Sequence, residues 1–174
     1  LYETALVTTD PFFANQSPYF YSVMVPSGAV TTIPGVLSEP IQFGDILLHG
    51  VDVAETAVSG QPLTVTLTWQ TLTPQQRPLT AFVHLLQPDA GSASLVAQHD
   101  GIPCSDTEPV SHWRTNELIL DEHIVDLPVE MENGRYLIGV GLYDTETFER
   151  LPVVDNEVDI RFGEAIIGAI DIQP

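Results

Sequence analysis

The segment from Pro62 to Thr71 constrains the fold most, because apolar and polar residues alternate along it. A period of two places one set of side chains on each face of a β-strand. Threonine at the polar positions favours a strand over a helix, since its β-branched carbon suits a pleated sheet and crowds a helical turn. We therefore expect a sheet with one buried and one hydrated face. The buried set is Leu63, Val65, Leu67 and Trp69.

Further short segments of strand character follow along the chain. The segment 79–87 is apolar on both faces around His84, which is typical of a central strand covered on both sides. Turn sequences such as Asn133-Gly134 separate the segments. This spacing predicts an all-β fold, a mostly antiparallel two-sheet β-sandwich of immunoglobulin-like or carbohydrate-binding-module-like form. The other strands expected are 41–53, 95–99, 118–127, 135–143, 150–154, 157–162 and 165–172.

Two glycines mark a close approach within one of these strands. Gly139 and Gly141 lie on the face opposite Ile138 and Val140. A strand that lacks side chains on one face leaves room for another backbone or a large ring. We expect Trp69 or Phe82 to fill that space.

The chain divides into two parts of different texture, with a boundary near residues 38–40. Residues 1–40 carry an aromatic cluster between Phe12 and Tyr21. We predict that this arm packs on the sandwich and adds an edge strand near Tyr19–Val25. The alternative is a stacking platform for a sugar or a partner. Residues 41–174 form the β-sandwich domain.

Composition limits the possible partners. The 174 residues include 24 acidic side chains and only five arginines, which gives a net charge of −19. Phosphate repels such a chain, so nucleic acid is not an expected partner. No run approaches the roughly 20 apolar residues that cross a bilayer, so we expect no direct membrane insertion of these residues. The chain begins at Leu1, and we interpret it as part of a longer polypeptide.

Metal and thiol chemistry find little support in the sequence. None of the five histidines has a second ligand at the spacing of a local zinc site. Pairing of their strands is the one route by which we expect His84 and His99 to meet. We predict an inert thiol for the single cysteine, Cys104, because its acidic surroundings raise the pKa. We expect no cofactor. A structural calcium ion is the alternative, at the acidic residues Asp144, Glu146, Glu149, Asp155, Glu157 and Asp159, which lack the order of an ion-wrapping loop.

A long loop from Gly101 to Glu117 carries Trp113. Loops of this length in a compact sandwich often carry function. Trp113 has two possible roles, either as a plug that closes one end of the sandwich or as a ring that contacts a ligand.

Several short sequence segments, taken together, resemble a known domain. The set resembles the carboxy-terminal β-sandwich that follows the transmembrane region of bacterial glycosyltransferase-like membrane proteins related to protein mannosyltransferases. The resemblance covers about residues 41–174, and Asn116 stands where that family's pattern has glycine. The phrases are 41–45 (IQFGD), 48–52 (LHGVD), 60–69 (GQPLTVTLTW), 82–85 (FVHL), 97–103 (AQHDGIP), Trp113, 134–136 (GRY), 140–144 (VGLYD) and 149–152 (ERLP).

The resemblance implies a non-catalytic accessory domain on the extracytoplasmic side of a larger membrane protein. We expect it to bind or position glycans, or to pack on its parent protein. Sugar stacking on aromatic rings is the expected mechanism, with Trp113, Tyr143 and His99 as the candidate ligand-binding residues. One alternative is a purely structural spacer. The other is a hydrolase acting on saccharides through paired carboxylates, with Asp100, Asp144 and Glu149 as the first acids to inspect.

Overall fold

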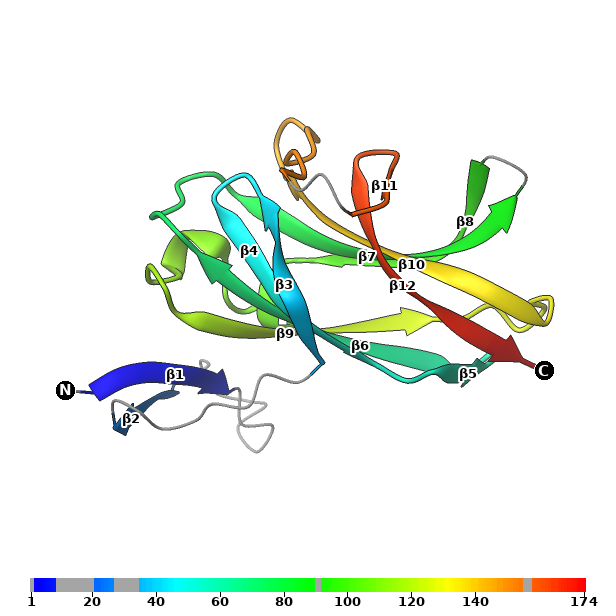
Figure 1. Ribbon diagram of the computed structural model, residues 1–174, viewed down its shortest axis with the longest axis horizontal. Helices are drawn as coiled ribbons and strands as arrows, with labels where there is room; N and C mark the ends of the chain where they lie inside the picture. The colour runs from blue at the N-terminus through cyan, green and yellow to red at the C-terminus, as the bar shows by residue number, and fades with distance from the viewer. Residues whose placement is uncertain (1, 9–20, 27–34, 90–91, 155–157) are drawn as a thin grey trace.

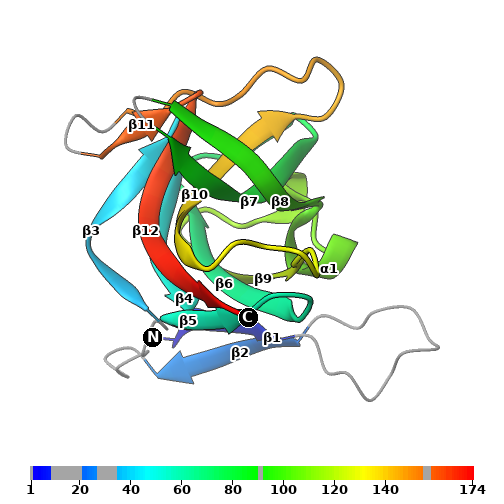
Figure 2. The ribbon, with the colours of Figure 1, turned by 90° about the vertical axis from the view of Figure 1, so that its right-hand side faces the viewer.

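The computed structural model describes residues 2–8, 21–26, 35–89, 92–154 and 158–174. Two mostly antiparallel sheets pack face to face, which confirms the predicted all-β sandwich (Figure 1). Figure 2 shows the two layers, with β6 and β9 in one and β7 and β8 in the other.

The first sheet has the strand order β2-β1-β9-β6-β4-β3. Its pairs are antiparallel except β1 with β9, which meet at Val7 and Ile119. The strand bounds are β1 Tyr2–Thr8, β2 Tyr21–Pro26, β3 Val36–Phe43, β4 Ile46–Val53, β6 Pro62–Thr71 and β9 Leu118–Asp126.

The second sheet has the order β11-β12-β10-β7-β8, and β5 pairs with β12 in parallel. The strand bounds are β5 Thr56–Val58, β7 Leu79–Asp89, β8 Ser92–Gly101, β10 Gly134–Asp144, β11 Ile160–Arg161 and β12 Glu164–Gln173.

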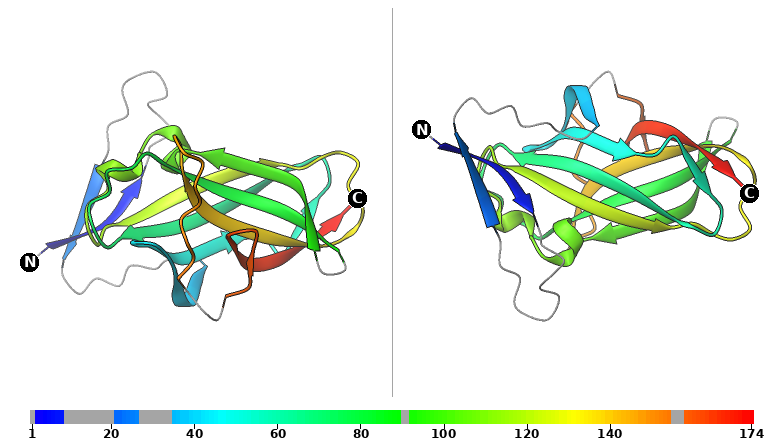
Figure 3. Two further views of the ribbon diagram at one scale, coloured as in Figure 1. Left: turned by 90° about the horizontal axis from the view of Figure 1, so that it is seen from above. Right: turned by 90° about the horizontal axis from the view of Figure 1, so that it is seen from below.

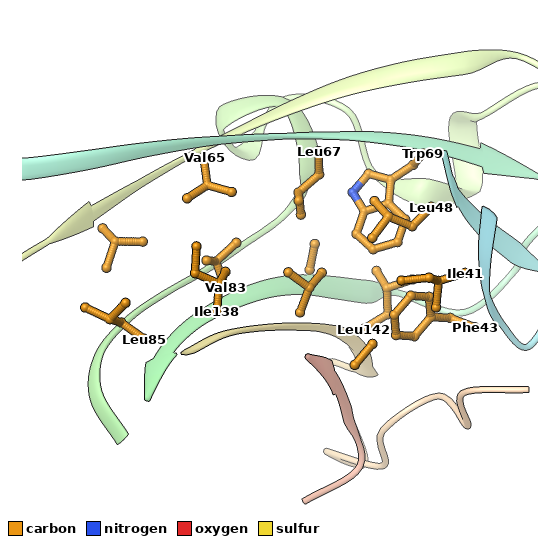
Figure 4. Packing of buried hydrophobic residues seen from close by; sticks show 14 of the residues in the cluster. Ile41, Phe43, Leu48, Val65, Leu67, Trp69, Val83, Leu85, Ile138 and Leu142 are labelled. Atoms are coloured by element: carbon orange, nitrogen blue, oxygen red, sulfur yellow. The ribbon is translucent and has the colours of Figure 1, made fainter. Parts of the chain in front are cut away.

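The core lies between the sheets and is filled by the alternating residues. Leu63, Val65, Leu67 and Trp69 of β6 are all buried, as the sequence pattern predicts. The indole of Trp69 meets the ring of Phe43 edge-on, with centroids 5.7 Å apart (Figure 4). Each fully buried side chain of this size contributes about 1.5–3 kcal/mol through removal of apolar surface from water.

Three strand predictions need correction. The segment 41–53 is not one strand, because Gly44, at φ 56°, turns the chain between β3 and β4. The segment 150–154 forms only isolated bridges, of Arg150 with Tyr143 and of Val153 with Phe43. Since those partners belong to different sheets, this segment crosses from one layer to the other and lies along neither. Of 157–162, only Ile160–Arg161 is a strand in the described part of the chain.

The N-terminal arm is only partly described. β2 forms the edge of the first sheet and overlaps the predicted edge strand. The aromatic residues 12–20, which are predicted to pack on the sandwich, lie outside the described residues. The predicted boundary at 38–40 falls inside β3.

The loop 101–117 contains two short helical turns, α1 (Pro103–Asp106) and a 3₁₀ turn at Val110–His112. Asn116 adopts φ 65°, a left-handed conformation that asparagine tolerates better than most residues. Within the described part of the chain, no helix is long and apolar enough to cross a membrane.

Candidate functional site

The structure does not bring the three candidate ligand-binding residues together. Tyr143 lies half-buried on β10, with its side chain on the outer face of the second sheet. His99 lies on β8 opposite Val83, a core residue, and therefore points between the sheets. Trp113 follows the 3₁₀ turn and belongs to the core cluster.

Trp113 occupies the position expected of a plug. Its side chain is buried, with 4% exposed, and its Nε1 donates a hydrogen bond to the Glu108 carbonyl at 3.2 Å. Both the ring and its polar edge are therefore covered by protein. A sugar has no open ring face of Trp113 to stack on in this structure.

His99 belongs to a polar chain that crosses the core. Its Nδ1 lies 2.9 Å from Nδ1 of His123 on β9, and His123 Nε2 lies 2.9 Å from Asp121 Oδ2. Since a carboxylate only accepts, His123 donates from Nε2. In the neutral His123 ring the other nitrogen, Nδ1, is then an acceptor, and His99 Nδ1–H donates to it. The prediction that strand pairing joins His84 and His99 is wrong. His99 lies opposite Val83, and His84 lies on the other face of the sheet.

Asp121 anchors this chain. It is 1% exposed, and its Oδ2 also accepts from Trp69 Nε1 at 3.1 Å, while its Oδ1 accepts from the Cys104 backbone N–H at 2.8 Å. A buried carboxylate needs such donors to offset the loss of water. These hydrogen bonds therefore give the buried polar groups of Asp121, His123 and Trp69 their partners. The bond from the Cys104 N–H also attaches the 101–117 loop to the first sheet.

Cys104 has the properties predicted for an inert thiol. Burial, with the nearby carboxylates of Asp121 and Glu108, raises its pKa from 9.0 to about 12. Its Sγ–H points at the Leu120 carbonyl, 3.0 Å away. The thiolate, which is the nucleophile, is therefore scarce at neutral pH.

A row of rings runs across the outer face of the second sheet. Phe148, in the turn after β10, stacks on Tyr143 with centroids 6.0 Å apart and an interplanar angle of 24°. Tyr143 lies 6.0 Å from Phe82, and Phe82 lies 4.5 Å from His84. We call Phe148, Tyr143, Phe82 and His84 the ring row. The row is buried at Phe82 and His84 and open at Phe148, which is 74% exposed.

The two glycines of β10 make room for this row. A Cβ on Gly141 would lie 2.3 Å from Phe82 Cζ, so only glycine admits the ring there. A Cβ on Gly139 would lie 2.9 Å from the carboxyl carbon of Glu164. The predicted close approach is confirmed for Phe82 and wrong for Trp69, which lies in the core of the first sheet.

Arg150 covers the buried part of the ring row. Its Cζ lies 4.7 Å above the centre of the Phe82 ring, a cation–π geometry. Its Nη1 donates to the Phe162 carbonyl and lies 4.0 Å from Glu164 Oε2. Glu164 is 1% exposed and its Oε2 lies 2.6 Å from His84 Nδ1. Seen from above in Figure 3, the segment after β10, drawn in orange, crosses this face.

Polar groups surround the open end of the row. Burial raises the pKa of Tyr143, the Thr80 hydroxyl lowers it, and the carboxylate of Asp100 raises it further. Asp100 is exposed, and it lies on β8 opposite Phe82. The open end therefore combines two stacked rings, one of which carries a phenol hydroxyl, with the Asp100 carboxylate. Hydroxyl and carboxylate groups bind the hydroxyls of sugars.

The predicted hydrolytic acids come from two places, since Asp100 lies on β8 and Asp144 ends β10. Asp144 is engaged in its own turn, where its Oδ1 accepts from the N–H groups of Glu146 and Thr147, both at 3.0 Å. The Thr147 N–H is the largest cause of the lowered pKa of Asp144. Glu149 is exposed and lies in the same turn. A general acid for glycoside hydrolysis needs a raised pKa, so Asp144 does not fit that role.

The calcium alternative has no further support from the described acids. Asp155 and Glu157 lie outside the described residues. Among the described histidine, cysteine, aspartate and glutamate side chains, no group of three is placed to hold a metal ion.

Comparison with known proteins adds no family assignment. No protein-family model matches the sequence, and no curated protein matches it.

Sequence reasoning missed Phe148, Arg150 and Glu164, which belong to the ring row or contact it. These residues form no sequence motif. They come from separate segments, namely the turn after β10, the crossing segment and β12, and meet only in the folded chain. It also missed Asp121 and His123. A signal for that pair exists, since both share the phase of Ile119 and Val125, which are buried.

Proposed function

We propose that this chain is a non-catalytic accessory domain that binds saccharides on the outer face of its second sheet. The observation that carries the proposal is the stacked pair of Tyr143 and Phe148, open to solvent at the end of the ring row. One face of a pyranose ring presents C–H groups, which pack on aromatic rings, while its hydroxyls bond to polar groups at the rim. Asp100 and the Tyr143 hydroxyl supply such groups.

The backbone at Phe148 supports a role beyond folding. Phe148 adopts φ 59°, a conformation that costs an ordinary residue about 1–2 kcal/mol and that glycine or asparagine adopts more readily. Its ring is 74% exposed and so recovers only part of that cost by burial. Strained residues of this kind cluster at functional sites. Stacking of a saccharide on the exposed ring would explain why a phenylalanine stands at this position.

The resemblance of residues 41–174 supports a proposed setting for the domain. In a larger membrane protein of the glycosyltransferase-like type, a saccharide-binding sandwich on the extracytoplasmic side would hold glycans near the membrane-embedded part. The two alternatives, a spacer and a hydrolase, receive no specific support from the ring row.

A glycan array followed by calorimetry on the whole chain tests the proposal. Phe148→Ala removes the exposed ring and is expected to weaken the best array ligand by about tenfold, the loss of roughly one stacking contact. Ile124→Ala is the matched control. Ile124 is 48% exposed on β9, on the outer face of the other sheet, so its truncation is expected to leave affinity unchanged.

Two results would overturn the proposal. One is a folded chain that binds no glycan on the array, which would leave the spacer role. The other is equal weakening by Phe148→Ala and Ile124→Ala, which would place binding away from the ring row.

A further inference from the structure

We infer that the tip of the β11–β12 hairpin forms a second saccharide subsite, so that the ligand of this face is an oligosaccharide and not a single sugar. This inference rests on the proposed function. It starts from an independent observation, a cleft of about 440 Å³ between that hairpin and the end of the β7–β8 hairpin. The lining residues are Pro88, Asp89, Ser92, Arg161 and Phe162. Figure 1 shows both hairpins rising from the same side of the second sheet.

The hairpin tip presents a phenylalanine where the backbone favours other residues. Phe162 and Gly163 connect β11 to β12, and both have positive φ, 52° and 78°. A two-residue turn with both φ values positive favours asparagine or aspartate followed by glycine. Phe162 is nevertheless the residue at the first position, and its side chain is 63% exposed. Phe162 thus repeats the combination found at Phe148, an open ring on a left-handed backbone.

The cleft supplies polar groups beside this ring. The Arg161 guanidinium is held by Asp159, which accepts from Nε at 3.0 Å and lies 3.0 Å from Nη2. A guanidinium carries five N–H donors, so the pair with Asp159 engages only some of them. Ser92, which is exposed, adds a hydroxyl to the opposite wall. An aromatic ring beside a fixed donor and a hydroxyl is the combination that binds a pyranose.

Arg150 joins the two subsites. Its guanidinium lies over Phe82, a member of the ring row, and it also donates to the carbonyl of Phe162. Arg150 therefore connects the ring row, which ends at Phe148, to the turn that carries Phe162. A single oligosaccharide that engages both gains from the second contact without a second loss of translational freedom.

The test measures affinity against chain length. A homologous series of two to six units of the best array ligand is titrated into the whole chain. We expect the six-unit member to bind about tenfold more tightly than the two-unit member. Phe162→Asn places the residue that the turn prefers, so the melting temperature is expected to stay equal or rise while the length advantage falls to about threefold or less.

A second variant keeps the test decisive if Phe162→Asn alters folding. Arg161→Gln removes the fixed donor on an exposed hairpin, and we expect it to reduce the length advantage in the same way. Ile124→Ala is again the control, with the length advantage intact.

The outcomes separate this inference from the proposed function. If short and long members bind equally well, the second subsite is wrong and saccharide binding at the ring row stands. Retention of the full length advantage by both variants also contradicts the second subsite. If no member of the series binds the folded chain, the proposed function and the subsite both fail.

Discussion

His99 and His123 face each other across the sandwich, with their Nδ1 atoms 2.9 Å apart. His99 belongs to β8 of the second sheet and His123 to β9 of the first. A hydrogen bond between the layers thus supplements the apolar core, and Asp121 completes it at the far end. The two histidines and Asp121 fix the relative position of the sheets in a way that hydrocarbon contacts alone do not.

The first prediction concerns Asp121. Asp121→Ala removes the acceptor of three buried donors, on Trp69, His123 and Cys104, and we expect a loss of about 3–5 kcal/mol in the free energy of unfolding. Urea denaturation measures it. Glu122→Ala, at the exposed neighbouring position, is the control and is expected to change stability by less than about 0.5 kcal/mol. A loss below about 1 kcal/mol for Asp121→Ala would show that the network contributes little.

The second prediction concerns the space beside Phe82. Gly141→Ala places a methyl group 2.3 Å from Phe82 Cζ, and relief of that clash is expected to cost about 1–3 kcal/mol of stability. Gly168→Ala is the matched control, since a Cβ there meets nothing within 4 Å. Thermal unfolding compares the two variants. Equal stability of both would mean that Phe82 does not occupy the space above Gly141.

Much of the fold was predictable because alternation reports which face is buried. The pattern of β6 identified the core residues of the first sheet directly. The sequence did not reveal the change of sheet at 150–154, because a segment that pairs with one residue of each layer has no periodicity of its own.

The candidate site was less predictable. Of the predicted ligand-binding residues, Tyr143 lies in the ring row, and its role stays a prediction. Trp113 lies in the core, because an indole in a long loop can close a sandwich as easily as bind a ligand. The ring row depends on contacts between β7, β10 and the turn after β10. Such contacts join residues far apart in sequence, so they cannot be predicted from the spacing of residues within one segment.

The third prediction concerns the reactivity of Cys104. With a pKa of about 12, the thiolate fraction at pH 8 is about 10⁻⁴, and the thiol is also buried. Alkylation by iodoacetamide at pH 8 is therefore expected to occur only as the chain unfolds. The measurement is the alkylation rate with and without denaturant, followed by mass spectrometry. Equal rates would show that Cys104 is accessible in the folded chain.

The fourth prediction is the pH dependence that the same thiol produces. The folded pKa is raised above the ordinary value of 9.0, so the contribution to stability is complete below pH 9 and is lost as the pH rises toward 12. Between these limits the unfolded chain releases the proton and the folded chain keeps it. The expected slope from this group is about −1.4 kcal/mol per pH unit.

Cys104→Ser isolates the effect of the thiol. Serine keeps a donor toward the Leu120 carbonyl but does not ionise in this range. Other groups with raised pKa values, among them Tyr136, remain in both proteins and cancel in the comparison. The difference in free energy of unfolding between native chain and variant is expected to shift with pH only above about 9. A difference that stays constant to pH 11 would contradict the raised pKa.

The central claim is that the outer face of the second sheet binds saccharide, and chemical-shift mapping tests it most directly. Amide resonances of the labelled chain are followed during titration with the best array ligand. The account predicts shifts at Asp100, Tyr143 and Phe148, with none at Ile124 on the opposite sheet. Shifts confined to residues outside the second sheet and its crossing segment, or no shifts at a saturating concentration, would contradict it.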